Sequence, residues 1–137
     1  MVENLRINLL KKSKNMSAKK EIHQGDIYMV NLSVGSIDHE QAGTRPCCIV
    51  SCDNRNIKSK NVFIFPITHA KKKNQPCHYK LYKKQYDFFS YDVNTVLCEE
   101  GRSISKKRLE RKLGSISLKD LLEILKIKEY IFIEKIT

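Results

Sequence analysis

Apolar residues gather in short runs through the middle of the chain, and each run is bounded by polar residues. Five runs stand out: DIYMVNL, PCCIVSC, NVFIFPIT, CHYKLY and VNTVLCE. Short runs rich in β-branched and aromatic residues predict strands, and the continuous apolar run PCCIVSC predicts a strand buried on both faces. The segments between the runs (residues 33–45, 52–60, 69–76 and 83–92) are polar, basic or rich in turn residues, so they predict loops.

The end of the chain has a helical pattern instead. Ser105 is placed to cap a short turn of helix over residues 106–112, and Ser117 with Asp120 resembles a capping box that opens a helix reaching about residue 134. One apolar stripe at i, i+3, i+4 and i+7 consists of Leu118, Leu121, Leu122 and Leu125. Further isoleucines at positions 124, 127 and 131 widen the stripe. The surplus indicates either a second contact surface, such as a dimer interface, or a helix fully buried at the edge of its own domain.

Short strands closed by helices in a chain of 137 residues predict a mainly β (α+β) fold, a compact barrel of five to seven strands with a C-terminal helix. Residues 1–22 carry six basic residues and two acidic residues without clear periodicity, so we expect a flexible basic extension. Residues 23–137 are expected to form one domain. No apolar run approaches the roughly 20 residues of a membrane span, and the N-terminus lacks a secretory apolar region, so a cytoplasmic location is expected.

The net charge and its distribution along the chain indicate a class of binding partner. Lysine and arginine total 26 against 15 acidic residues, a net charge of +11. The excess is segregated: residues 55–84 contain nine basic residues and no acidic one. Such clustering indicates a polyanionic partner bound in a salt-dependent manner, the alternative being a solubilising surface.

Cysteine spacing points away from disulfide and metal chemistry. The five cysteines are odd in number, and no pair has Cys-x-x-Cys spacing. We therefore expect reduced thiols that pack as small apolar residues, and neither a metal site nor a cofactor.

A sequence motif narrows the function. Gly25, Asp26 and Tyr28 are followed by the stretch EQAGTRP at residues 40–46, and later by FIFPIT, KKKNQPCHYKL and LCEEGRSISKKRL. In this order the segments resemble the MazF/PemK family of toxin endoribonucleases from bacterial toxin–antitoxin pairs, over residues 22–133. The resemblance implies an SH3-like barrel, also shared by the CcdB toxins, that is usually homodimeric.

The resemblance further implies an endoribonuclease that cleaves single-stranded mRNA without a metal, leaving a 2′,3′-cyclic phosphate. The catalytic pair carried over is Arg45 and Thr68. A cognate acidic antitoxin would inhibit the enzyme. Two other classes stay open: a CcdB-like toxin that binds DNA gyrase, and a non-catalytic nucleic-acid-binding barrel.

The residues themselves support electrostatic catalysis. A guanidinium forks onto phosphate oxygens, and Pro46 keeps the preceding Arg45 extended at the end of its strand. Thr68 offers a short hydroxyl donor. An arginine remains protonated near neutral pH, so its electrostatic role is easier to justify than a role as general base.

Further residues are candidates for substrate binding. They lie in the loops around the catalytic pair and on the fourth strand: Glu40, Gln41, Asp53, Asn56, His69, Lys71, Lys72, Lys73 and His78. Glu40 and Gln41 either orient Arg45 or read a base, or else they anchor their loop. His39 and His69 either share proton transfer or have no role. Because several loops depart from the family pattern, cleavage specificity cannot be transferred.

Overall fold

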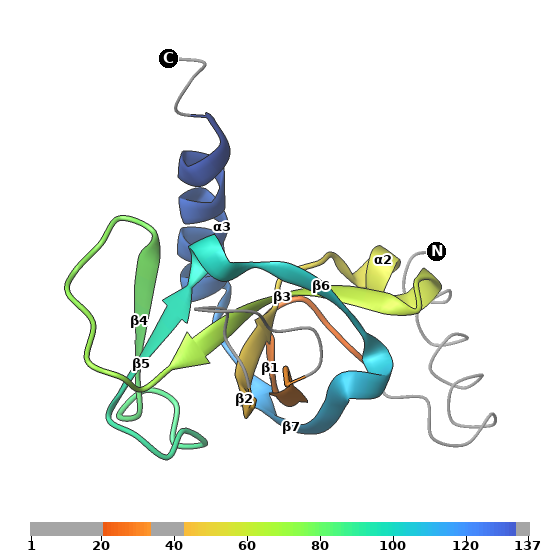
Figure 1. The fold of residues 1–137 in the computed structure, drawn as a ribbon, viewed down its shortest axis with the longest axis horizontal. Coiled ribbons are helices and arrows are strands. Elements are labelled where there is room, and N and C mark those ends of the chain that lie inside the picture. The colour runs from red at the N-terminus through yellow and green to blue at the C-terminus, as the bar shows by residue number, and fades with distance from the viewer. Residues whose placement is uncertain (1–20, 34–42, 134–137) are drawn as a thin grey trace.

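The computed structural model describes residues 21–33 and 43–133, and Figure 1 shows how their elements are arranged. The strands are β1 (Asp26–Asn31), β2 (Thr44–Ile49), β3 (Asn61–Thr68), β4 (His78–Tyr82), β5 (Val93–Leu97), β6 (Arg102–Ser105) and β7 (Leu109–Ser115). The helices are α2 (Asp53–Lys58) and α3 (Leu118–Ile133), with short 3-10 turns η1 (Cys98–Glu100) and η2 (Lys106–Arg108). This confirms the predicted mainly β fold with a C-terminal helix.

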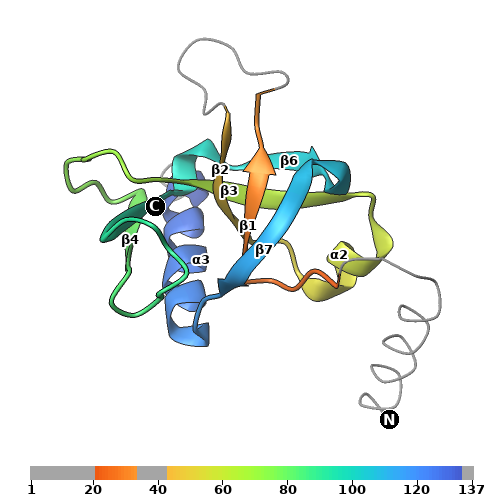
Figure 2. The same ribbon diagram turned by 90° about the horizontal axis from the view of Figure 1, so that it is seen from below.

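Five of the seven strands surround one apolar core. The sheet runs β4-β5-β3-β2-β1-β7, all pairs are antiparallel, and β6 also pairs with β3. Because η2 joins β6 directly to β7, strands β7, β1, β2, β3 and β6 form a barrel (Figure 2). We call the apolar residues enclosed by it the inner core: Ile22, Tyr28, Val30, Leu32, Cys47, Ile49, Val62, Ile64, Ile104 and Leu109. Strands β4 and β5 extend beyond the barrel as a two-stranded arm.

β3 belongs to both the barrel and the arm. One of its edges pairs with β2, and the other pairs first with β6 and then with β5. The three-residue turn η1 separates β5 from β6 along that second edge. The backbone polar groups of successive residues in a strand point to alternate edges. The Phe63 carbonyl accepts a hydrogen bond from the Val50 amide on the β2 side, so the backbone nitrogen of Pro66, three residues later, points to the second edge, where η1 interrupts the pairing. Its missing N–H therefore removes no bond from the sheet.

Helix α3 packs on the outer side of the sheet. Its buried residues Leu121 and Ile124 join a second cluster, the outer core, which includes Ile27, Phe65, Leu81 and Val96. The predicted cap is present, because the Ser117 hydroxyl accepts a hydrogen bond from the Asp120 amide at 3.2 Å. The predicted stripe is partly wrong: Leu118 and Leu122 are 70% and 49% exposed. The helix contacts the outer core through Leu121, Ile124, Leu125, Ile127 and Ile131, so the buried face includes the widening isoleucines and excludes two of the predicted leucines.

Three local predictions are wrong. Residues 53–58 form α2 rather than a loop, because the buried Asn56 amide folds this segment onto Ser51. Residues 106–112 form η2 and the start of β7 rather than a helix, because pairing with β1 and burial of Leu109 override local helix propensity. The sequence places Ile22 in the extension, but this side chain is 5% exposed within the inner core, so Ile22 belongs to the packed domain.

All five cysteines lie in the described ranges and are free thiols. Three of them, Cys47, Cys48 and Cys98, are buried, as expected for small apolar residues. Burial raises the pKa of each of these three thiols, to about 12 for Cys47 and Cys98. Within the described residues, no helix is long and apolar enough to cross a bilayer.

Candidate functional site

The sheet register brings the two predicted catalytic residues to the same level. β2 pairs with β3 from Ile49 opposite Ile64 to Cys47 opposite Pro66, and continuing this antiparallel register two residues past its last pair places Arg45 level with Thr68. Thr68 in turn pairs with Thr95 of β5, and Thr95 pairs with Lys80 of β4. Residues level with one another across an antiparallel sheet project from the same face. We call these four residues, from Lys80 to Arg45, the polar row.

The polar row lies where the barrel opens onto the arm. Cys47 and Ile64 belong to the inner core, and side chains alternate along a strand, so Arg45 and Thr68 share the face of that core. Beyond β3, the same face of the sheet is formed by β5 and β4, which lie outside the barrel. The row therefore joins a buried apolar interior to an outer polar surface.

Thr68 is held in a defined position at the end of β3. Its side chain is buried, at 8% exposed, and its hydroxyl oxygen accepts a hydrogen bond from the Ala70 amide at 3.1 Å. That contact fixes the oxygen and uses one of its lone pairs, so the hydroxyl hydrogen is free to turn toward an acceptor. Thr68 is arranged to donate to an incoming oxygen atom.

Arg45 is half-buried on β2, and a second arginine lies nearby. Burial raises the pKa of the Cys47 thiol to about 12, while the charges of Arg45 and Arg102 act in the opposite direction. The positive charges of both guanidinium groups therefore act at Cys47. The concentration of positive charge favours an anion at this end of the barrel.

His69 and Tyr91 form an exposed aromatic pair directly beyond Thr68. Their rings are stacked with centroids 3.8 Å apart and an interplanar angle of 10°. The predicted contacts Lys71, Lys72 and Lys73 follow in the same loop and are exposed. Whether His69 and these lysines bind substrate stays a prediction.

His78 is tied to an acidic side chain. Its Nε2 lies 2.6 Å from Glu99 Oε2, and the Cys77 thiol donates to the same oxygen at 3.6 Å. These three residues bring potential metal ligands within 4.8 Å of one another, although their mutual hydrogen bonds account for the arrangement. An open hollow of about 420 Å³ borders the arm here; its lining residues are Asn74, Gln75, His78, Tyr79, Lys80 and Tyr82. Lys80 links this hollow to the polar row.

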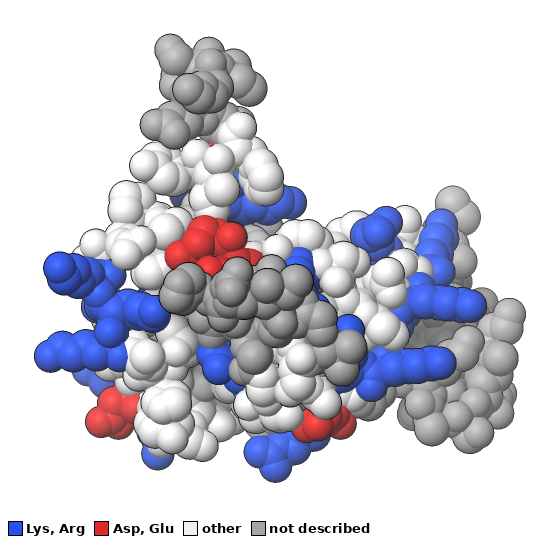
Figure 3. Space-filling view, in the orientation of Figure 1, with Lys and Arg blue, Asp and Glu red and all other residues white. Residues whose placement is uncertain are grey.

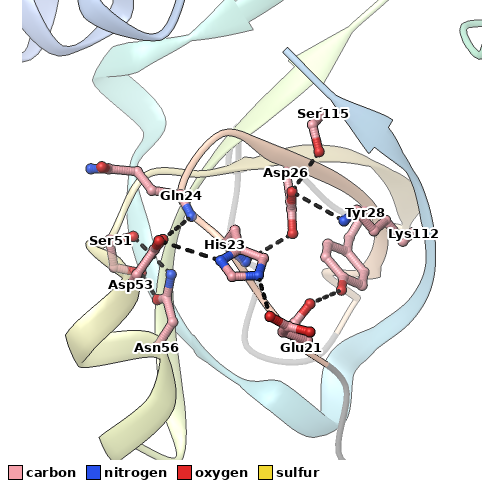
Figure 4. Close-up of polar contacts among 10 residues, drawn as sticks. All are labelled: Glu21, His23, Gln24, Asp26, Tyr28, Ser51, Asp53, Asn56, Lys112 and Ser115. Atoms are coloured by element: carbon pink, nitrogen blue, oxygen red, sulfur yellow. Dashed lines mark hydrogen bonds and ion pairs between the residues drawn. The ribbon is translucent and has the colours of Figure 1, made fainter. Parts of the chain in front are cut away.

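Asp53 and Asn56 bind the protein itself (Figure 4). The Asp53 carboxylate accepts from the Gln24 amide at 2.8 Å and contacts His23 Nδ1 at 3.3 Å. Asn56 is 2% exposed, and its amide group is satisfied by the side chain and carbonyl of Ser51. The polar atoms of the Asn56 side chain are thus used inside the fold, and substrate binding by this residue stays a prediction. Asp53 has the same anchoring role for the segment that leads into β1.

The same figure explains the Gly-Asp-x-Tyr part of the motif. Asp26 is 1% exposed and accepts hydrogen bonds from the His23 amide at 2.8 Å and the Ser115 hydroxyl at 2.7 Å. Lys112 pairs with this carboxylate at 3.3 Å. Gly25 has a φ of +91°, a conformation that favours glycine. These motif residues join the start of β1 to β7, so their role is structural.

The remaining predicted residues, Glu40 and Gln41, lie outside the described residues, as does His39. Sequence reasoning missed Thr95 and Lys80 as neighbours of Thr68, because only the strand register places them there. Figure 3 shows lysine and arginine side chains spread over the visible face, with acidic side chains gathered at several places among them. The basic surface predicted from the sequence is thus divided rather than continuous on this face.

The barrel, its two-stranded arm and the packed C-terminal helix together define a small toxin fold. The chain belongs to the family of PemK-like, MazF-like toxins of type II toxin–antitoxin systems, whose family model matches residues 23–129. This confirms the resemblance found in the sequence.

Individual relatives agree with this assignment. The chain is 36% identical to "Endoribonuclease MazF" of Staphylococcus epidermidis over 106 residues, which is 75% of this chain and 84% of that protein. Among solved structures, MazF (Form-I) from Deinococcus radiodurans has a TM-score of 0.69 at 21% identity, covering 82% of this chain and 97% of that one. A mycobacterial endoribonuclease in complex with its cognate antitoxin has a TM-score of 0.65 at 18% identity, covering 80% and 92%. The two structures support the fold.

Proposed function

We propose that this chain is the toxin of a toxin–antitoxin pair and acts as an endoribonuclease on single-stranded RNA. The observation that carries the proposal is the polar row, in which Arg45 and Thr68 lie level on one face. The name of the staphylococcal relative, an endoribonuclease, supports the same activity.

RNA carries its own nucleophile, the 2′-hydroxyl beside the scissile phosphate. The 2′-oxygen forms a bond to phosphorus, and the bond from phosphorus to the 5′-oxygen breaks. The proton released from the 2′-hydroxyl is balanced by the proton delivered to the leaving 5′-oxygen. The products are a 2′,3′-cyclic phosphate and a 5′-hydroxyl end.

The protein's part in this reaction is to hold the phosphate and stabilise its growing charge. The Arg45 guanidinium binds two phosphate oxygens, and the Thr68 hydroxyl, already fixed by the Ala70 amide, donates to one of them. Donors fixed in advance stabilise a transition state without reorganising during the reaction. The positive charge of Arg45 and the hydrogen bond from Thr68 stabilise the transition state, so the proposed reaction needs no bound metal.

The rest of the basic surface holds the RNA backbone. Lys71, Lys72 and Lys73 are exposed beside Thr68, and Lys80 extends the polar row toward the hollow on the arm. Phosphate contacts of this kind release counterions, so RNA affinity falls steeply as salt rises.

The same surface suits an acidic antitoxin. Neighbouring structures include MazE–MazF of D. radiodurans and a mycobacterial endoribonuclease with its cognate antitoxin. A disordered acidic segment that folds over the positive site of this chain would mask it. The proposal also includes a homodimer, a cytoplasmic location, and a basic extension preceding the barrel domain.

Purified protein incubated with a long RNA in the presence of EDTA tests the proposal. Wild type should cleave the RNA to products with 5′-hydroxyl ends. Arg45→Ala should abolish cleavage, and Thr68→Ala should reduce kcat by about 100- to 1,000-fold, the usual effect of losing one fixed donor. Matched controls are Arg111→Ala and Thr44→Ala, two exposed residues outside the polar row.

The outcomes separate the three classes of protein. Intact RNA with salt-sensitive binding would indicate a nucleic-acid-binding barrel. Intact RNA together with inhibition of gyrase supercoiling would indicate the gyrase-directed class. Equal activity of Arg45→Ala and wild type would refute the assigned site even if RNA is cut.

A further inference from the structure

The stacked rings of His69 and Tyr91 have no packing role that explains them. Tyr91 is 52% exposed and His69 is also exposed, so neither ring contributes to the inner or the outer core. Three other aromatic residues of the connector between β4 and β5 (Tyr86, Phe88 and Phe89) do pack against the outer core. An exposed pair of parallel rings is a surface prepared for contact.

The backbone on both sides of the pair is fixed. His69 follows the buried Thr68, whose hydroxyl binds the Ala70 amide at 3.1 Å, so the chain around His69 is held by a tight turn. On the other side, the Asn94 side-chain amide donates to the Tyr91 carbonyl at 2.8 Å. The pairing of Thr68 with Thr95 brings these two anchored segments together at the end of β3 and the start of β5. Figure 1 shows both loops leaving the sheet at this corner.

We propose that the His69–Tyr91 pair is a stacking platform for one unpaired base of the RNA, next to the scissile phosphate. This inference rests on the proposed ribonuclease function. Flat aromatic faces bind single-stranded nucleic acid by stacking, and the ring spacing of 3.8 Å is close to the spacing of about 3.4 Å between neighbouring bases.

The position of the platform determines which base it receives. His69 is adjacent in the chain to Thr68, the residue assigned to the phosphate, so the stacked base belongs to a nucleotide flanking the cut. Lys71, Lys72 and Lys73 follow in the same loop and accompany the next phosphates. Stacking tolerates every base, and it favours purines at this position because their π face is larger.

The assignment gives His69 a positioning role instead of proton transfer. A base stacked on the pair orders the strand across Thr68 and Arg45. Removing the platform then raises KM and lowers kcat/KM, while the cut position and the 5′-hydroxyl product stay the same.

Cleavage of a short oligonucleotide with one cut site tests the platform. The protein variants are Tyr91→Ala, Tyr91→Phe, which keeps the aromatic face, and Tyr130→Ala, a control tyrosine on α3 that is 55% exposed. The substrates carry an abasic nucleotide at each position on either side of the cut. We expect Tyr91→Ala to lower kcat/KM by about 5-fold or more, the lower end for loss of one stacked base. Tyr91→Phe and Tyr130→Ala should remain within twofold of wild type by the same measure.

The decisive result is the combination of the two changes. At one flanking position, an abasic nucleotide should lower kcat/KM of wild type about as much as Tyr91→Ala does, and it should have little further effect on Tyr91→Ala. If the two effects multiply at every position, or if Tyr91→Ala cleaves like wild type, the platform is refuted while the ribonuclease proposal stands. Absence of cleavage by wild type would instead refute the proposed function itself.

Discussion

Loss of the Asp26 carboxylate should lower the free energy of unfolding of this domain. Its carboxylate is 1% exposed and receives three groups: the His23 amide, the Ser115 hydroxyl and the Lys112 ammonium. They come from the segment before β1 and from β7. The change Asp26→Ala removes the acceptor from two part-buried hydrogen bonds, those of the His23 amide and the Ser115 hydroxyl.

The expected size follows from burial. The Lys112 side chain is 42% exposed, so water can solvate its charge when Asp26 is removed and the cost of a fully buried ion pair does not apply. Leaving a hydrogen-bond donor without its partner costs about 1–3 kcal/mol. Asp26→Ala should therefore lower the free energy of unfolding by about 1–3 kcal/mol. Asp26→Asn keeps one oxygen acceptor and should lower it by less.

Asp53 provides a matched control, because its carboxylate holds the same segment from the other side. It accepts from the Gln24 amide and contacts His23, but its side chain is 54% exposed. An exposed pair contributes about 0–1 kcal/mol, so Asp53→Ala should have a small effect.

Urea unfolding near neutral pH, followed by circular dichroism, measures all three variants against wild type. Protein concentration must be the same throughout, because an oligomer gains stability with concentration. Similar m-values would show that the same surface is exposed on unfolding. A loss below about 1 kcal/mol for Asp26→Ala, or equal losses for Asp26→Ala and Asp53→Ala, would refute the argument from burial.

Three further predictions concern titration, packing and thiol exposure. Burial lowers the pKa of His23, but the neighbouring carboxylates of Glu21 and Asp53 outweigh this effect and raise the pKa above its ordinary 6.5. Protonated His23 therefore stabilises the folded state at pH below 6.5, and this contribution disappears as pH rises through the folded pKa. Unfolding of His23→Gln and wild type across this range should therefore differ most at acidic pH, and a constant difference would contradict the assignment. Gly114→Ala would place its Cβ 2.5 Å from the Phe88 ring and should cost about 1–3 kcal/mol in thermal or urea unfolding, partly recovered by adding Phe88→Leu. Ellman's reagent should modify only Cys52 and Cys77 in the native protein and all five thiols in urea, and rapid reaction of a third native thiol would show that the core is more open than described.

The sequence was most informative where one local pattern and the tertiary environment agree. NVFIFPIT predicts a strand with the bounds that β3 has, because the run is apolar throughout and polar residues flank it. The motif also places Arg45 and Thr68 at strand ends, and the register makes them level. For these residues, burial and pairing impose what the local pattern already favours.

The sequence-based predictions failed where contacts with residues distant in the sequence determine whether a side chain is buried. Asn56 is polar and lies in a polar stretch, yet it is buried because Ser51 satisfies its amide. Leu118 and Leu122 continue an apolar stripe, but the helix turns its face with Leu121 and Ile124 toward the sheet and leaves these two leucines exposed. The platform residue Tyr91 has no local signal of its own, since its position depends on how β5 pairs with β3.

Because β3 is shared by the barrel and the arm, its amide hydrogens should be protected from solvent exchange to different degrees along its length. Between barrel and arm only two residue pairs of β3 and β5 are joined, Ile67 with Val96 and Thr68 with Thr95. Within the barrel, β3 is flanked on both edges around Ile64. Amide hydrogens of the barrel half should therefore exchange with deuterium only on global unfolding, whereas those of the arm exchange through smaller openings. Thr68 lies at the boundary between these two regimes, so a bound strand of RNA or antitoxin that spans it should slow exchange in the arm far more than in the barrel.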